Sequence, residues 1–291
     1  MIEVTRNEER REEPGTLYVV ATPIGNLEDI TYRAVRVLGE VDLIAAEDTR
    51  HTRKLLSHLA ISKPLISYYK DRETARSEKI IEELLAGRDV ALVSDAGTPA
   101  ISDPGAILVS QCQEHLIKII AVPGPSALTT ALSVAGLTQP SFTFLGFLPA
   151  KKSQRLKTLT AHAQDETATD FYESRRRVCM TLAGCKEIFG ERKFFIGREL
   201  TKIHEELLSG TISQLLANLA ERNEIKGEFV IIVFPGQSTE PASPGDIEEL
   251  LCWYRDNSGL SLKDSVKKIA RDLNLSRSLV YEKALHVWDK K

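Results

Sequence analysis

The sequence predicts an α/β protein of two α/β domains followed by a small helical appendage. Short apolar runs alternate with stretches of helical periodicity along the chain, and this alternation is typical of a largely parallel sheet covered by helices. Turns containing Gly and Pro directly follow several of the apolar runs. Because ligand crevices lie at the carboxyl ends of parallel strands, these turns also indicate where a site would form.

The N-terminal domain is expected over residues 15–147, after a charged segment, 1–14, that we interpret as a flexible tail. Its strands are predicted from apolar runs at 16–21, 43–46, 65–69, 90–93, 118–122 and 142–145. Its helices are predicted at 31–38, 52–59, 73–86, 106–112 and 126–135, and in 73–86 the apolar residues repeat with a helical period.

The second α/β domain is expected over residues 148–237. Pro149 and the basic residues after it are interpreted as a connecting linker, and strands are predicted at 169–172, 194–197, 205–208 and 229–234. The Pro- and Ser-containing segment 237–245 is predicted to be a flexible linker.

The tail, residues 246–291, is predicted to be helical, with the spacing of a helix-turn-helix. Ala270 is small enough for two helices to approach, Asn274 suits the turn, and Leu275 and Val280 would pack the second helix. Since the charge of this segment is nearly balanced, we favour a packing or RNA-contacting appendage over a DNA-reading module.

Composition limits the possible functions. A chain of 291 residues, 42% hydrophobic and 27% charged, is typical of a globular protein with more than one domain. No apolar run approaches the ~20 residues of a membrane helix, and the N-terminus does not resemble a signal peptide. The four cysteines lack CxxC spacing and no His/Cys cluster suggests zinc, so we expect reduced thiols, a cytoplasmic location and no metal. Because the net charge is −3, any nucleic-acid surface must be local.

Common phosphate-binding signatures are absent from the sequence. It contains neither a P-loop motif nor GxGxxG after the first strand. Three other turn segments follow predicted strands, at 21–26, 94–99 and 122–127. Their occurrence together in one domain favours a ligand site over ordinary tight turns.

Longer motifs resemble one known family. They are ATPIGNLEDIT (21–31), AAEDTRHT (45–52), SDAGTP (94–99), PGPSA (123–127), GFLPAK (146–151), FYES (171–174), RELTK (198–202) and KGEFV (226–230). In this order they resemble the ribosomal RNA small subunit methyltransferase I family, within the superfamily of tetrapyrrole methylases and diphthine synthase. The resemblance runs from about residue 16 to 234, and the helical tail also fits.

The resemblance implies a fold of two α/β domains with S-adenosylmethionine in the cleft between them, and a homodimer. It implies methylation of the ribose 2′-oxygen of a cytidine in the decoding region of small-subunit (16S) rRNA. It also implies that the second-domain side of the cleft is lined by Tyr172, Arg198, Glu199, Glu228 and Phe229.

Chemistry selects the other cofactor candidates. A cationic sulfonium is matched better by a carboxylate and by backbone carbonyls than by Lys or Arg, so Asp95 is the first candidate. Ser126 and Ala127 begin a predicted helix and offer backbone N–H groups. The full set on this side is Pro23, Asp95, Ala96, Gly97, Thr98, Pro99, Ser126 and Ala127.

A ribose hydroxyl is a poor nucleophile, so a proton acceptor is expected. Glu47 and Asp48 end a predicted strand on the crevice side, and Arg50 follows them. We expect one carboxylate to accept the proton while Arg50 holds a phosphate. A salt-bridged strand end is the alternative interpretation of these residues.

Basic residues near predicted loop ends are candidates for contact with RNA. They are Arg53, Lys54, Lys70, Arg72, Lys151, Lys152, Arg155, Arg175 and Arg176. The segments 68–73 and 175–177 depart from the family pattern, which leaves the exact nucleotide open. Two alternatives also stay open: a small-molecule methylase of the same superfamily, and a non-catalytic nucleic-acid-binding factor using the C-terminal helices.

Overall fold

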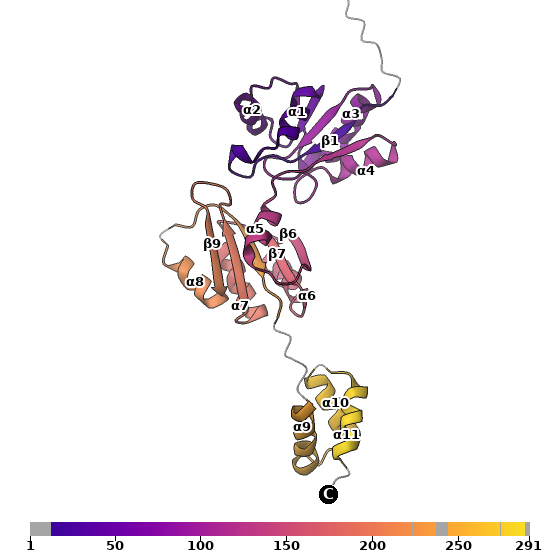
Figure 1. The fold of residues 1–291 in the computed structure, drawn as a ribbon, viewed down its shortest axis with the longest axis vertical. Coiled ribbons are helices and arrows are strands. Elements are labelled where there is room, and N and C mark those ends of the chain that lie inside the picture. The colour runs from indigo at the N-terminus through magenta and orange to yellow at the C-terminus, as the bar shows by residue number, and fades with distance from the viewer. Residues whose placement is uncertain (1–12, 223, 237–243, 274, 289–291) are drawn as a thin grey trace, which may run out of the picture. The chain divides into compact units, whose positions relative to one another are not determined.

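The computed structural model describes residues 13–222, 224–236, 244–273 and 275–288. The chain divides into two compact units, the first ending at Phe234 and the second beginning at Pro235 (Figure 1). The expected flexible tail and the linker at 237–245 fall largely on residues outside the described ones. No described helix is both long and apolar enough to span a membrane.

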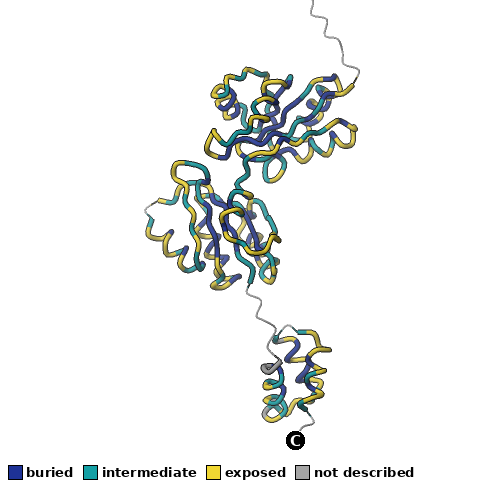
Figure 2. The backbone as a smooth tube through the Cα atoms, viewed as in Figure 1, coloured by how far each residue is buried: buried dark blue, intermediate teal, exposed yellow. Residues whose placement is uncertain are grey.

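The first sheet of the larger unit is parallel throughout, with the strand order β3-β2-β4-β1-β5. Its strands are β1 (Leu17–Val20), β2 (Leu43–Ala46), β3 (Leu65–Ser67), β4 (Val90–Val93) and β5 (Ile119–Val122). β2 and β4 are buried along their whole length (Figure 2), which explains why they read as continuous apolar runs rather than alternating ones.

Helices cover both faces of this sheet. α1 (Tyr32–Glu40) and α2 (Thr49–His58) pack on one face through Val37, Leu38 and Leu56. α3 (Glu73–Leu85) and α4 (Ala106–Glu114) cover the other face through Ile80 and Leu108. This doubly wound arrangement brings the loops after β1, β2, β4 and β5 to one edge of the sheet.

The second sheet has the order β6-β7-β10-β8-β9 and is mixed, because only β6 and β7 run parallel. Its strands are β6 (Phe142–Phe147), β7 (Ala168–Ser174), β8 (Lys193–Arg198), β9 (Glu206–Thr211) and β10 (Glu228–Val233). α5 (Ala127–Ala135) packs on one face through Ala131 and Ala135, and α6 (Lys152–Ala161), α7 (Val178–Phe189) and α8 (Ile212–Ala220) cover the other.

Two local expectations differ from this arrangement. The strand at 142–145 was expected to close the N-terminal domain, but β6 pairs with β7 in the second sheet. The basic stretch after Pro149 was expected to be a linker, but it forms α6. Strand and helix signals are local, whereas the partner of an edge strand is decided by distant residues. The domain boundaries at 15, 147, 148 and 237 remain predictions.

The smaller unit contains α9 (Pro244–Asn257), α10 (Leu262–Asp272) and α11 (Arg277–Val287), and these helices share an apolar core. Ala270 and Val280 are buried in it, as the expected helix-turn-helix requires. The backbone N–H of Leu275 donates to the carbonyl of Ala270 at 2.8 Å, which closes the turn between α10 and α11. Asn274, which we expected in the turn, lies outside the described residues.

Candidate functional site

Hydrogen bonds hold the loops after β1 and β4 together. The backbones of Thr22 and Gly97 exchange two hydrogen bonds of 2.9 and 3.0 Å, and the Thr22 hydroxyl donates to the carbonyl of Ser94. Gly97 has φ +82°, a conformation that L side chains rarely adopt. The Thr98 hydroxyl donates to the carbonyl of Pro125 at 3.2 Å and so attaches the loop after β5. Hydrogen bonds therefore link the three predicted turn segments to one another.

A second set of hydrogen bonds joins the ends of β2 and β4. The Asp95 backbone N–H donates to Glu47 Oε2 at 3.3 Å, and the Asp48 backbone N–H donates to Asp95 Oδ1 at 3.0 Å. Glu47 lines the cavity at this edge of the sheet. Burial raises the pKa of Glu47, and the nearby carboxylate of Asp103 raises it further.

Asp48 and Arg50 do not line this cavity, contrary to the expectation for them. Asp48 is the N-cap of α2: its side chain accepts the backbone N–H of Arg50 at 2.8 Å and pairs with the Arg50 guanidinium. Those hydrogen bonds hold the pKa of Asp48 far below its usual range. The alternative interpretation, a salt-bridged strand end, therefore describes these two residues, while Glu47 points to the cavity side.

The loop after β4 continues past the predicted motif and supplies two residues that were not among the predicted site residues. Ser102 and Asp103 both line the cavity. The Ser102 hydroxyl is buried, with no hydrogen-bond partner among the described residues. Burial and the carboxylate of Asp95 raise the pKa of Asp103. The loop is anchored where the Gly105 backbone N–H donates to Glu73 Oε1 at 2.8 Å.

Aromatic side chains of the second sheet form the opposite wall. Tyr172 contacts the rings of Phe144 and Phe147 edge-on, with centroid distances of 5.0 and 5.4 Å. Burial raises the pKa of the Tyr172 phenol, and a hydrogen bond with the Ser126 side chain lowers it. Ser126 precedes α5, so this contact joins the helix to the second sheet.

Glu199 and Glu228 also line the cavity on the side of the second sheet. Lys202 Nζ pairs with Glu199 at 2.8 Å and with Glu228 at 3.0 Å. The Glu228 backbone N–H donates to Glu199 Oε1, and Gly227 permits this approach because a Cβ there would lie 2.4 Å from Glu199 Cγ. The Asn26 N–H donates to Thr201 Oγ1 at 3.1 Å, which ties this loop to the loop after β1.

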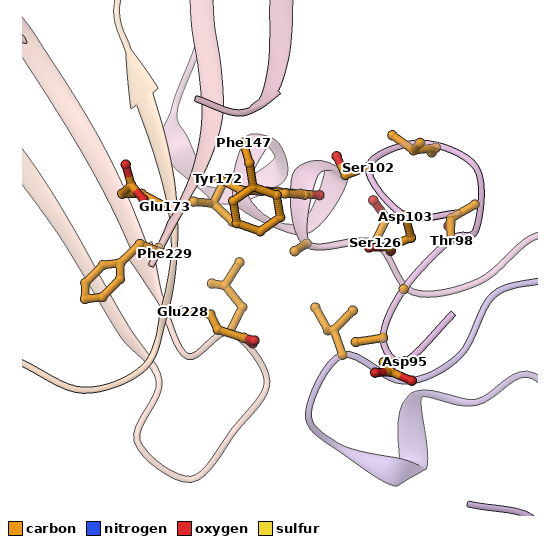
Figure 3. A pocket seen from close by; sticks show the side chains of 18 of the residues that line it. Asp95, Thr98, Ser102, Asp103, Ser126, Phe147, Tyr172, Glu173, Glu228 and Phe229 are labelled. Atoms are coloured by element: carbon orange, nitrogen blue, oxygen red, sulfur yellow. The ribbon is translucent and has the colours of Figure 1, made fainter. Parts of the chain in front are cut away.

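Most cofactor candidates line one cavity (Figure 3). The candidates that line it are Asp95, Ala96, Gly97, Thr98, Ser126, Ala127, Tyr172, Glu199, Glu228 and Phe229. The ring of Phe229 points away from the cavity into the core of the second sheet, so this residue lines it through its backbone.

Three cofactor candidates are not among the lining residues: Pro23, Pro99 and Arg198. Arg198 instead pairs with Glu206 at 3.1 Å and donates to the carbonyl of Lys226. Lining residues that we did not predict are Ile24, Ile101, Ser102, Asp103, Phe147, Glu173, Gly197, Leu200, Lys202 and Val230. The quoted motifs contain Ile24, Phe147, Glu173, Leu200, Lys202 and Val230 and could have indicated them, whereas Ile101, Ser102, Asp103 and Gly197 lie outside those motifs.

Charge in this cavity is strongly unbalanced. Five carboxylates line it, from Glu47, Asp95, Asp103, Glu199 and Glu228, against Lys202 as the single cation among the described lining residues. Glu173 lines the cavity through its backbone, because its carboxylate is buried on the other face of the sheet, where it pairs with Arg177 at 2.8 Å. The cavity therefore suits a ligand that carries positive charge next to an apolar or aromatic part. Among the described residues, no group of three or more His, Cys, Asp or Glu side chains is arranged to hold a metal.

The basic candidates lie outside the cavity, and all but one are exposed. The exposed residues are Arg53, Lys54, Lys70, Arg72, Lys151, Lys152, Arg175 and Arg176. Arg155 is 4% exposed and donates to the carbonyls of Pro149 and Ala150, so its expected place on an RNA surface is wrong. The local sequence carries no signal that distinguishes this buried arginine from an arginine on the surface.

The sequence of this chain is similar to those of one known family of proteins. A family model described as tetrapyrrole (corrin/porphyrin) methylases matches residues 16–216. A protein of Halalkalibacterium halodurans called ribosomal RNA small subunit methyltransferase I is 42% identical, covering 94% of this chain and 96% of its own. Proteins of the same name from Xylella fastidiosa and Bacillus subtilis are 50% and 38% identical, over 76% and 95% of this chain and 81% and 96% of their own.

Solved structures agree on the fold. A uroporphyrin III C-methyltransferase from Thermus thermophilus aligns with a TM-score of 0.55 at 15% identity, covering 75% of this chain and 97% of its own. A diphthine synthase aligns with a TM-score of 0.59 at 12% identity, covering 76% and 90%. At these identities the likeness concerns the fold alone, and it confirms the expected fold class.

Proposed function

Because this chain belongs to the ribosomal RNA small subunit methyltransferase I family, within the tetrapyrrole methylases, we propose the reaction that the motifs imply. It uses S-adenosylmethionine to methylate the ribose 2′-oxygen of a cytidine in the decoding region of small-subunit rRNA. The observation that carries the proposal is the cavity at the carboxyl ends of β2, β4 and β5, with its excess of carboxylates facing an aromatic wall.

The residues of the cavity fit this cofactor. Asp95 and the backbone from Ala96 to Thr98 would face its cationic end, since carboxylate and carbonyl oxygens stabilise positive charge. Tyr172 and Val230 would bury its apolar parts, and Glu199 and Glu228 would accept its polar donors. When bound, S-adenosylmethionine supplies a methyl group already activated by its sulfonium. The protein then has to align the acceptor oxygen and remove its proton.

Glu47 is the proposed proton acceptor. It lines the cavity and is held by the Asp95 N–H, and its raised pKa makes the carboxylate more basic than an exposed glutamate. Asp48 is unsuited because Arg50 and the start of α2 hold its pKa low. Arg50 is 85% exposed in its side chain, so it is a candidate for RNA contact rather than for the chemical step.

The RNA would be held by exposed cations that lie outside the cavity. Those proposed are Arg50, Arg53, Lys54, Lys70, Arg72, Lys151, Lys152, Arg175 and Arg176. The family resemblance supports a homodimer as the working form, and an rRNA substrate supports a cytoplasmic location. No metal is required by the proposed chemistry.

The test is methyl incorporation from labelled S-adenosylmethionine into small ribosomal subunits taken from a strain without this protein. The RNA is digested and its nucleosides are identified by mass spectrometry. A 2′-O-methylcytidine from the decoding region is expected. Naked rRNA run in parallel shows whether the substrate is free RNA or the assembled subunit.

Two results would contradict the proposal. Methyl transfer to a tetrapyrrole or another small molecule, with none to rRNA, would favour the alternative methylase of the same superfamily. Binding to small subunits without any affinity for S-adenosylmethionine by calorimetry would favour a non-catalytic nucleic-acid-binding factor.

A further inference from the structure

Charge is segregated within the small C-terminal unit. α9 carries four acidic side chains and one arginine, whereas residues 261–278 carry five Lys or Arg side chains and two aspartates. The whole segment is nearly neutral, so its overall charge hides this separation. One end of the unit is therefore basic although the protein as a whole is acidic.

The basic side chains converge on a groove between α10 and α11. The groove is lined by Asp264, Lys267, Lys268, Ala270, Arg271, Leu275 and Arg277. Lys267 and Arg271 are four residues apart on α10 and so lie on one face, separated by about 6 Å along the axis. The turn closed by Leu275 returns the chain so that Arg277, in the first turn of α11, lines the same groove.

The groove holds one acid against four cations, so its lining is basic on balance. That acid, Asp264, accepts a hydrogen bond from the Ser261 hydroxyl at 2.6 Å in the cap at the start of α10. The N-terminus of α11, which Ser276 caps, adds the positive end of a helix dipole beside Arg277. Lys267, Lys268, Arg271 and Arg277 are all exposed.

We propose that this groove binds the phosphodiester backbone of RNA and acts as a second contact that retains the rRNA substrate. The inference rests on the proposed function for the identity of the RNA. Cations spaced about one helical turn apart match a row of phosphates, and such contacts position a nucleic acid without reading its sequence.

The exposed surface of α11 argues against reading of duplex DNA. A helix that reads the major groove presents polar side chains to base edges. Beyond its first turn, α11 exposes Tyr281 at 46% and Leu285 at 54%, beside Glu282 and His286, and adds no further cation to the groove. The cations are instead gathered on α10 and at the start of α11, where they suit backbone contact.

The experiment measures binding of the full chain to a hairpin RNA from the decoding region. Fluorescence anisotropy over a series of salt concentrations is carried out for the unaltered protein, for Lys267→Gln and Arg277→Gln, and for the double variant. Each substitution should weaken binding and reduce the slope of log K against log salt by about 1, because one phosphate contact is lost. Thermal unfolding verifies that the variants fold.

Lys283→Gln is the matched control. Lys283 also lies on α11 but faces Glu248 of α9, 3.7 Å away, and does not line the groove. This variant loses the same charge and should keep the salt slope of the unaltered protein. A reduction equal to that of Arg277→Gln would overturn the proposal, because it would reflect net charge rather than the groove.

Other outcomes separate this inference from the proposed function. The double variant should keep its affinity for S-adenosylmethionine and its kcat, while KM for the rRNA substrate rises. An unchanged salt slope in the double variant would overturn the proposal that the groove binds RNA, even if the protein methylates rRNA. If the unaltered protein transfers no methyl group, the proposed function fails, but the anisotropy series still tests RNA binding. Duplex DNA that competes as well as RNA would overturn the assignment to RNA.

Discussion

Glu47 accepts a hydrogen bond from the backbone N–H of Asp95 at 3.3 Å, so the end of β2 and the loop after β4 hold each other in place. Asp95 in turn accepts the N–H of Asp48. Two residues that the sequence suggested for different roles, proton acceptor and cofactor ligand, are therefore mechanically coupled. A substitution at Glu47 or Asp95 must therefore keep both hydrogen bonds if its effect on turnover or cofactor binding is to be interpreted.

Replacing Glu47 with Gln keeps a side-chain oxygen for the Asp95 N–H but removes the proposed base. Turnover should fall by about 10²-fold or more while affinity for S-adenosylmethionine is kept. Asp48→Asn is the control, because Asp48 lies outside the cavity and Asn still caps α2. Single-turnover methylation and calorimetry measure both quantities. Normal turnover of Glu47→Gln would place the base elsewhere, with Asp103 the next candidate in the cavity.

The pH dependence of turnover should follow the same carboxylate. Burial and the Asp103 carboxylate raise the pKa of Glu47, and only the deprotonated form accepts a proton. Activity should therefore fall on the acid side through a pKa above that of an ordinary glutamate. In Asp103→Asn the loss of activity on the acid side should move to lower pH, because one of the causes that raise the pKa of Glu47 is removed. A loss that stays at the same pH would contradict the assignment to Glu47.

Asp95→Asn should weaken the binding of S-adenosylmethionine while changing the stability of the fold little. Asn still accepts the Asp48 N–H, but the negative charge next to the proposed sulfonium is lost. The dissociation constant for S-adenosylmethionine should rise about tenfold, which is about 1.4 kcal/mol. Asp42→Asn is a matched control, because Asp42 accepts the Asp89 N–H at 2.8 Å outside the cavity. Equal weakening in both variants, measured by calorimetry, would argue against a charge effect.

Asp170 should make stability fall as the pH rises. It is 0% exposed on β7, neither carboxylate oxygen has a hydrogen-bond partner among the described residues, and burial raises its pKa to about 7. Between about pH 4 and 7 the folded chain keeps a proton that the unfolded chain has released, so this residue costs about 1.4 kcal/mol per pH unit across that window.

The near-isosteric Asp170→Asn removes this titration. Urea unfolding should find the variant closest to the unaltered protein at about pH 4, where the unfolded chain also begins to hold this proton. At pH 8 the variant should be the more stable of the two. The same difference in stability at both pH values would contradict a buried titrating carboxyl.

The ion pair between Glu173 and Arg177 should matter for stability because it is removed from solvent. Glu173 is fully buried in its side chain, and it also accepts the Thr181 hydroxyl at 2.7 Å. Arg177→Met would leave the carboxylate buried without its cation and should cost about 3–5 kcal/mol of unfolding free energy. Arg36→Met breaks a pair that is 60% exposed and should change little. Chemical denaturation compares the two variants.

Charge removal outside the cavity should affect RNA affinity alone. Replacing Lys151, Lys152, Arg175 and Arg176 with Gln should weaken binding to rRNA and lower its salt dependence. Arg155 is left out of this set because its guanidinium is bound to carbonyls inside the protein. Calorimetry with S-adenosylmethionine provides the control, and an unchanged salt dependence would remove these residues from the proposed RNA surface.

Local sequence signals were sufficient for much of the fold. Continuous apolar runs located β2 and β4, a helical period located α3, and the motifs around Asp95 and Ser126 contribute residues to one cavity. These features depend on residues within a few positions of one another, and parallel strands bring their carboxyl ends to one edge without further information. The resemblance of the motifs then identified the family.

The tertiary structure decided which of these neighbours work together. β6 joined the second sheet, Glu47 turned to the cavity while Asp48 capped α2, and Arg155 was buried. Adjacent residues such as Glu47 and Asp48 are chemically alike in sequence. Asp48 is set apart by its local cap on α2 and its pair with Arg50, whereas the surroundings of Glu47 come from Asp95 and Asp103, far away in the chain. The burial of Arg155 and the strand partner of β6 are likewise decided by the packing of the whole domain.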